Sequence, residues 1–255
     1  MSYRPQSNYN VDVRHSLVAG RAMVGIRGHD HTIPNGGPFS LSPGFGGGGY
    51  TIDQSAIAAT PAVVGVASTD NTNDNVAGTG ALTVLVSGLD ASGNAATESV
   101  TMTGQTAVNT IATFSAVHEL LVLTTGGNNA NTGTIYVGTG TFTAGVPAVR
   151  MASMEIGSNI SSTGYYVVPT GKTLYLTGMT ASVVGSKEAE LLVSISADGI
   201  LWRTAVTFAV TSISAGAPIL SSPGYAAGTH VRLSASGTAA STVSTFILDG
   251  ELVDD

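Results

Sequence analysis

Cysteine is absent from the 255-residue sequence. Disulfide bonds, thiolate nucleophiles and zinc sites built on cysteine are therefore excluded. Charge is scarce as well, because only 10% of the residues are charged, against about 25% in an average soluble domain. A composition this poor in charge is unlike the surface of an ordinary cytosolic enzyme.

Positive charge is the scarcer sign. Nine Lys and Arg residues stand against sixteen Asp and Glu, which gives a formal net charge of −7. A protein that binds nucleic acid by displacing counterions needs a basic surface, so no nucleic-acid partner is expected. Apolar stretches are interrupted well before the roughly 20 residues that a membrane helix needs, and residues 1–10 lack the apolar core of a signal peptide. We expect no membrane partner and assembly in a cytosol.

Glycine is abundant, with 33 residues, and 43% of the chain is hydrophobic. Short runs rich in Val, Thr, Ile and Leu lie between Gly and Asn clusters, which is typical of strands joined by turns. No twelve-residue segment keeps a convincing helical stripe. The runs are Ala62–Ala67, Ala81–Val86, Glu98–Thr103, Leu120–Leu123, Thr134–Val137, Tyr165–Val168, Thr173–Val184, Ala189–Ala197, Leu201–Val210, His230–Ser236 and Thr242–Val253.

These patterns predict an all-β protein with two β-sandwich, jelly-roll-like domains at residues 56–150 and 151–255. Residues 1–55 are predicted to form an extended, Gly-rich N-terminal arm, because Gly and Pro break any helical period there. The apolar side chains of this arm must be buried against another chain or domain, so we expect the arm to dock. The arm also carries four of the nine basic residues: Arg4, Arg14, Arg21 and Arg27.

The segment Pro169–Thr173 reads PTGKT, and its last three residues match the end of a phosphate-binding loop. The spacing fails, because that signature needs glycine where the chain has Tyr166. Leu174 and the residues after it alternate as a strand where a helix should begin. A turn is the better interpretation, and no nucleotide cofactor is expected.

Two segments carry metal-ligand residue types. His29 and His31 would share one face of an extended strand, and three copies around a threefold axis would supply six imidazole nitrogens to an octahedral ion. Two ligands in one chain are too few, so the preferred interpretation is histidines in a flexible polar loop that are solvated or hydrogen-bonded to backbone. Asp70–Asn75 offers oxygen ligands for calcium but lacks the glycine and glutamate of an EF-hand, and a tight turn is favoured.

No catalytic residues are assigned. His15, His118 and His230 are candidate bases, but no serine lies in a GxSxG turn. His118 and Glu119 would point to opposite faces of a strand. No pair of acids suggests glycoside cleavage. We therefore predict a non-enzymatic protein without catalytic, cofactor-binding or metal-binding residues.

Aromatic residues leave one alternative open. Trp202, Tyr165 and Tyr166 could stack on sugar rings in a binding module. Because aromatic rings are so often buried, a role in the sandwich core or a subunit interface is preferred.

Several strand and turn segments follow a recognisable pattern: Ala77–Ala91 (AGTGALTVLVSGLDA), Glu98–Gly104 (ESVTMTG), Phe114, Asn131–Val137 (NTGTIYV) and Tyr165–Leu176 (YYVVPTGKTLYL). These segments resemble a recurring pattern in structural proteins of aquatic tailed bacteriophages. Together they span most of residues 60–255, although the acidic, tryptophan-containing stretch that usually precedes a Gly-Gly-Tyr in this family lacks its tryptophan before Tyr50.

The resemblance implies a virion component, assembled in the host cytoplasm, that sits on the capsid surface as a decoration, cement or head-fibre protein, or is attached to the neck or tail. Its implied partners are the major capsid or neck and tail proteins, and other copies of itself, with a trimer preferred by analogy. Low charge and abundant small residues independently fit a subunit that covers its surface with neighbours. The alternative function is a receptor- or carbohydrate-binding module of a tail fibre.

Overall fold

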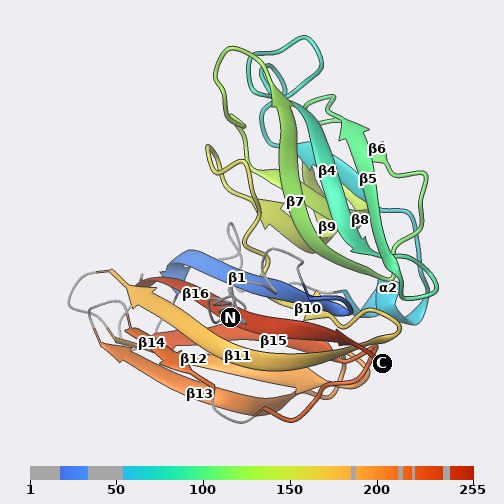
Figure 1. Cartoon of the computed structure of the whole chain (residues 1–255). Helices are drawn as coiled ribbons and strands as arrows, with labels where there is room; N and C mark the ends of the chain where they lie inside the picture. Colours follow the sequence, from blue (N-terminus) through green and yellow to red (C-terminus); the bar gives the residue numbers. More distant parts are fainter. Residues whose placement is uncertain (1–17, 34–53, 185–187, 212–214, 220–221, 238–241) are drawn as a thin grey trace, which may run out of the picture.

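The computed structural model describes most of the chain, and β-strands dominate it (Figure 1). Among the described residues the helical structure is the short α2 (Ser55–Ala59), and no helix there is long and apolar enough to cross a bilayer. The all-β prediction is confirmed. The described ranges are 18–33, 54–184, 188–211, 215–219, 222–237 and 242–255.

Eight strands form the sandwich drawn in the lower half of Figure 1. They are β1 (Arg21–Ile33), β10 (Tyr165–Val167), β11 (Lys172–Val183), β12 (Glu188–Ser196), β13 (Arg203–Thr211), β14 (Ala215–Pro218), β15 (His230–Gly237) and β16 (Thr242–Asp254). One sheet has the order β1-β16-β11-β14 and the other β10-β15-β12-β13, with antiparallel pairing. If these eight strands are renumbered 1 to 8 in the order in which they occur in the sequence, the two sheets have the strand orders 1-8-3-6 and 2-7-4-5. This is the strand order of a jelly roll.

Seven strands form the other sandwich, drawn above the jelly roll in Figure 1. They are β3 (Gly65–Ser68), β4 (Ala81–Leu89), β5 (Ala95–Thr101), β6 (Val108–Asn109), β7 (Ala116–Thr125), β8 (Ile135–Thr143) and β9 (Val146–Met154). Its sheets have the orders β6-β3-β8-β9 and β5-β4-β7. All of these strands follow β1 and precede β10, so this unit is inserted between the first and second strands of the jelly roll. We call it the inserted sandwich.

This topology changes both ends of the predicted domain division. Residues 21–33, expected to lie in the arm, form β1 and pair along their length with β16. Ile26 is buried in the jelly-roll core and Val24 packs against it, so this part of the arm is buried against its own chain. At the other boundary, 150/151 cuts through β9, which pairs with β8. The rest of the predicted arm that lies in 1–17 and 34–53 is outside the described residues.

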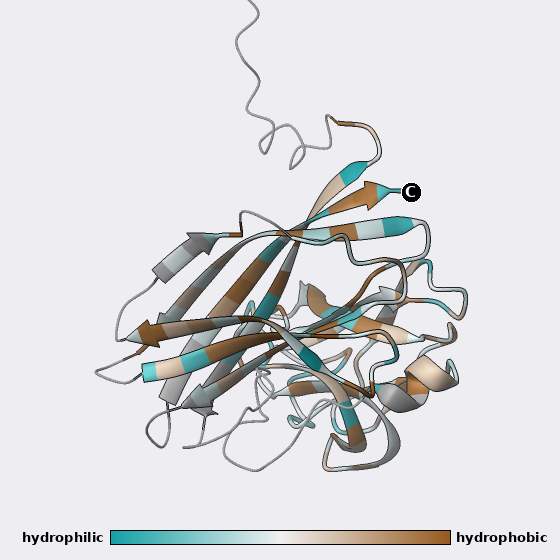
Figure 2. Cartoon of the chain, turned by 90° about the horizontal axis from the view of Figure 1, so that it is seen from below, coloured by the Kyte–Doolittle hydropathy of each residue, from teal (hydrophilic) through white to brown (hydrophobic). Residues whose placement is uncertain are grey.

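Alternation of polar and apolar residues explains why these segments form strands (Figure 2). In β11, Leu174 and Leu176 are buried whereas Tyr175 between them is 40% exposed, as expected where successive side chains point to opposite faces of a sheet. The turn before β11 places Gly171 at a φ of 72°, in a region that glycine enters without strain.

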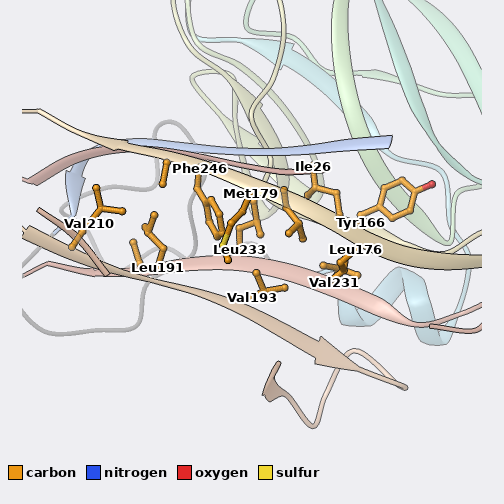
Figure 3. Packing of buried hydrophobic residues seen from close by; sticks show 14 of the residues in the cluster. Ile26, Tyr166, Leu176, Met179, Leu191, Val193, Val210, Val231, Leu233 and Phe246 are labelled. Atoms are coloured by element: carbon orange, nitrogen blue, oxygen red, sulfur yellow. The ribbon is translucent and has the colours of Figure 1, made fainter. Parts of the chain in front are cut away.

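Each sandwich has its own apolar core. In the jelly roll the side chains interdigitate between the two sheets, with Phe246 and Met179 facing Leu233 and Leu191 (Figure 3). The inserted sandwich buries a separate cluster that includes Phe114 and Leu120. Two independent cores are what is expected of two units that each bury one face of two sheets.

Candidate functional site: the junction of the two sandwiches

A third, smaller apolar cluster joins the two units. Leu89 and Ala116 of the inserted sandwich are buried against Tyr165 and Val167 of β10, and Trp202 packs on this group. Hydrogen bonds extend the contact, because Thr170 N donates to Gly93 O at 2.8 Å and Thr170 Oγ1 donates to Ser92 O at 2.8 Å. We call this set of contacts the junction.

His118 crosses the junction from β7. Its Nε2 accepts a hydrogen bond from Val167 N at 3.1 Å, and its ring lies 4.3 Å from the ring of Tyr166, tilted by 32°. Because a backbone N–H can only donate, Nε2 carries no proton and the imidazole is neutral. Burial, together with the nearby His230, lowers the pKa of His118 from 6.5 to about 3. His118 thus serves as an uncharged connector between the sandwiches.

A cavity of about 200 Å³ lies beside His118, and residues of both sandwiches line it, including Arg27, Glu119 and Tyr166. Burial raises the pKa of Glu119, while the Arg27 charge opposes that shift. Burial also raises the pKa of Tyr166. His118 and Glu119 border the same cavity, although the sequence predicted that they would point to opposite faces. Among the residues that line this cavity, the positive charge of Arg27 therefore partly balances the negative charge of Glu119.

A second set of polar groups surrounds His230 on β15, which pairs with Val167 of β10. The Tyr165 hydroxyl is 2.5 Å from His230 Nδ1, and burial lowers the pKa of His230 while Asp198 opposes the shift. Asp198 itself accepts hydrogen bonds from Leu201 N and Ile200 N at 2.9 Å, and these bonds hold its pKa at about 2. Its carboxylate caps the turn that carries Trp202.

Trp202 is also engaged. The Arg232 guanidinium lies 4.1 Å from the centroid of a Trp202 ring, a cation–π contact, and Tyr165 meets the same side chain edge-on at 6.2 Å. Tyr165 and Tyr166 are 5% and 9% exposed. The preferred interpretation of these aromatics as buried structural residues is confirmed for the two tyrosines, and one face of Trp202 is covered.

Of the candidate bases, His118 and His230 are both held in the junction, and neither has a serine among its hydrogen-bond partners in the described residues. His15 lies outside those residues. Within the same ranges no group of three His, Cys, Asp or Glu side chains is placed to hold a metal ion. Of these two histidines, His118 contacts the jelly roll across the junction, whereas His230 bonds to Tyr165 within the jelly roll.

The two histidines of the HxH pair lie on β1, which runs in extended conformation there as predicted. His29 Nδ1 is 2.7 Å from Thr245 Oγ1 on β16, and its Nε2 is 3.9 Å from Glu155 Oε2 of the inserted sandwich. The His31 side chain is outside the described part of the structure. His29 is therefore a hydrogen-bonded histidine on a strand, and its described partners are side chains rather than the backbone that was expected.

In the segment 70–75 the acidic side chains cap a turn. Asp70 Oδ1 accepts from Thr72 N at 2.7 Å and Asn73 N at 2.8 Å, and hydrogen bonds, first from the Asn73 side chain, lower the pKa of Asp70 to about 2. Asp74 is fully buried and is bonded by five donors of the protein. The turn interpretation of this segment is confirmed.

The PTGKT segment is also a turn, as predicted. β11 begins at Lys172 with no helix following. The Lys172 ammonium forms an ion pair with Asp254, and Thr173 Oγ1 donates to Asp255 Oδ1 at 2.6 Å. Both side chains that would hold a phosphate in a phosphate-binding loop instead fix the end of β16.

Two structurally important residues, Gln54 and Arg232, could not be recognised from the sequence pattern. Gln54 is 2% exposed; its Nε2 donates to Val117 O at 2.7 Å and Met151 O at 3.0 Å, and its Oε1 accepts from Val117 N at 2.7 Å. Arg232 lies in a strand whose alternation of apolar residues marks its position as facing away from the core. A lone Gln or Arg has no sequence signature, because its partners are distant in the chain.

Comparison with known proteins found no relative of this chain, because neither a protein-family model nor a curated protein matches the sequence.

Proposed function

We propose that this protein is a non-enzymatic structural component of a tailed-phage virion. It acts as an oligomeric subunit on the capsid surface, as a decoration, cement or head-fibre protein, or attached to the neck or tail. Its partners are copies of itself and the major capsid or neck and tail proteins.

The observation that carries the proposal is the jelly roll with a second sandwich inserted at its edge. Jelly rolls are frequent in viral capsid and lectin domains, although fold alone does not determine function. The junction adds support, because His118 bonds to Val167 and Tyr165 packs against Leu89, so that a buried contact joins the two sandwiches. Two β-sandwiches joined through a buried contact suit a subunit that keeps its shape within a particle.

The test is to purify the phage that encodes this sequence through a density gradient and to quantify the protein by mass spectrometry. We expect its peptides to co-purify with intact particles at a fixed ratio to the major capsid protein. A map of the particle should then show a density that fits the two sandwiches. Presence in the infected-cell lysate together with absence from intact particles would overturn the proposal.

A further inference from the structure

Strand β13 ends the sheet β10-β15-β12-β13 and pairs with β12 on one side only (Figure 1). Among the described residues no other strand pairs with its outer edge. Such an edge presents unpaired N–H and C=O groups that can template another strand. Ala205 is an extra residue in the pairing with β12, because Val193 faces Val206 and Ser194 faces Thr204. The regular part of the free edge is therefore 206–211.

Two other long edge strands, β7 and β9, are covered or protected. The edge of β7 is bonded by the segment 159–161, where Val122 N donates to Asn159 O and Ser161 N donates to Leu120 O, both at 2.9 Å. β9 carries Pro147 and a charged residue within the strand, and proline and charge both discourage edge pairing. The stretch 204–211, TAVTFAVT, has neither.

The free edge is also incompletely buried on its apolar face. Val210 is 1% exposed, whereas Val206 and Phe208 are only partly buried against the jelly-roll core. On the opposite face Thr207 and Ala209 are exposed. A strand added at this edge would complete the cover over Val206 and Phe208 without burying a charge.

The sequence of the edge is self-complementary. In an antiparallel pair of two β13 strands centred on Phe208, Val206 faces Val210 of the other copy and Thr207 faces Ala209. The two Phe208 side chains then meet across the twofold axis. Aromatic and β-branched cross-strand pairs stabilise antiparallel sheets, and small residues on the outer face cause no clash. Arg203 stays outside the paired stretch.

We propose that β13 is an interface between two copies of this chain. The two β13 edges pair antiparallel about a twofold axis centred on Phe208, so that two four-stranded sheets become one continuous sheet. Such a contact is isologous and closes on itself as a dimer. It differs from the trimer expected by analogy, which needs a head-to-tail contact between different surfaces.

The first test is the mass of the full chain in solution, measured by light scattering during size-exclusion chromatography. We expect a concentration-dependent dimer for the native sequence and a monomer for Thr207→Pro, because proline has no N–H to donate to a strand ladder and discourages edge pairing. Thr101→Pro on β5, an exposed position of another edge strand, is the matched control and should remain dimeric. A native monomer or trimer, or a Thr207→Pro dimer, would overturn the proposal.

The second test keeps the proposal falsifiable if a proline variant misfolds. Because the chain contains no cysteine, introduced cysteines report only their own contacts. The double variant Thr207→Cys with Ala209→Cys should form a disulfide-linked dimer under mild oxidation, since these positions face each other across the pair. The control Thr207→Cys with Ser99→Cys, in which position 99 is an exposed site on β5, should crosslink at least tenfold more slowly. Equal rates would overturn the proposed register.

Discussion

The buried carboxylate of Asp74 connects three separate chain segments through hydrogen bonds, at Ser68, at Ala81 and at residues 132–133. Its Oδ1 accepts from Ala81 N, Thr132 N and Thr132 Oγ1, and its Oδ2 accepts from Ser68 Oγ and Gly133 N, at distances of 2.7 to 3.1 Å. Both oxygens therefore face at least one backbone N–H. We expect Asp74→Asn to lower the free energy of unfolding by about 2–4 kcal/mol, because either orientation of the amide sets an NH2 group against a buried donor.

Urea denaturation measures this loss, and Asp70→Asn is the control. The Oδ2 atom of Asp70 accepts a hydrogen bond from the Asn73 side chain, which can rotate to suit an amide. The control should lose less than about 1 kcal/mol. Equal losses in the two variants would contradict the assignment of Asp74 as the anchor of this loop.

His118 makes stability depend on pH. Its pKa falls from 6.5 to about 3 on folding, so the unfolded chain takes up a proton first. The stability is complete above pH 6.5 and is lost as the pH falls from 6.5 towards 3, by up to about 1.4 kcal/mol per pH unit. The lowered pKa of His230 acts in the same direction.

Urea unfolding of the native protein and of His118→Gln at pH 7, 6 and 5 checks this expectation. The glutamine oxygen can still accept from Val167 N but does not titrate, so the variant should show a shallower decline. Asp70 and Asp198, with pKa values of about 2, add their losses only below about pH 4. Parallel curves for the two proteins would show that His118 is not the titrating group.

At the scale of secondary structure, β1 is the element whose role changed most from sequence to structure. Ile26 is 4% exposed within the jelly-roll core, so Ile26→Ala should lower the free energy of unfolding by about 2–4 kcal/mol. Met23, half-buried and outside that core, is the control and should lose less than about 1 kcal/mol as Met23→Ala. Thermal denaturation compares them, and similar losses would argue against β1 as a core strand.

Local patterns explain which elements could be predicted. The hairpin of β4 and β5 is visible in the sequence because Asp90 caps its own turn, bonding to Ser92 N and Asn94 N at 2.7 and 3.0 Å. β9 was missed because its turn uses Ala144 and Gly145, both at positive φ, where Asn-Gly is the usual signal. Pro147 and Arg150 also interrupt the pattern of β-forming residues by which a strand is recognised in the sequence.

Distant pairings could not be predicted from the sequence. β1 looks like an arm because its partner β16 lies at the other end of the chain, and no local pattern reports such a contact. The junction was hidden for the same reason: His118 and Val167 are 49 residues apart. Sequence alternation revealed strands and turns, whereas their assembly depends on contacts that alternation does not encode.

For the whole molecule, the insertion predicts which fragments fold. The inserted sandwich, residues 54–161, contains both of its sheets and its own core, so it should unfold cooperatively when expressed alone. The fragment 151–255, the second domain expected from the sequence, lacks β1 and should not. Circular dichroism during urea titration distinguishes them. A cooperative transition for 151–255 would show that β1 is dispensable for the jelly roll.

The pairing of β1 with β16 also sets the order of events during synthesis. Arg21 and its ion-pair partner Glu251 are 230 residues apart in the chain. When β1 leaves the ribosome, its partner strand has not been translated, whereas the inserted sandwich emerges with all of its own strands. Because domains fold as units during translation at about 5–20 residues per second, β1 must wait for ten seconds or more with an unpaired edge. During this time the unpaired N–H and C=O groups of β1 are available for pairing with a chaperone or with a neighbouring nascent chain.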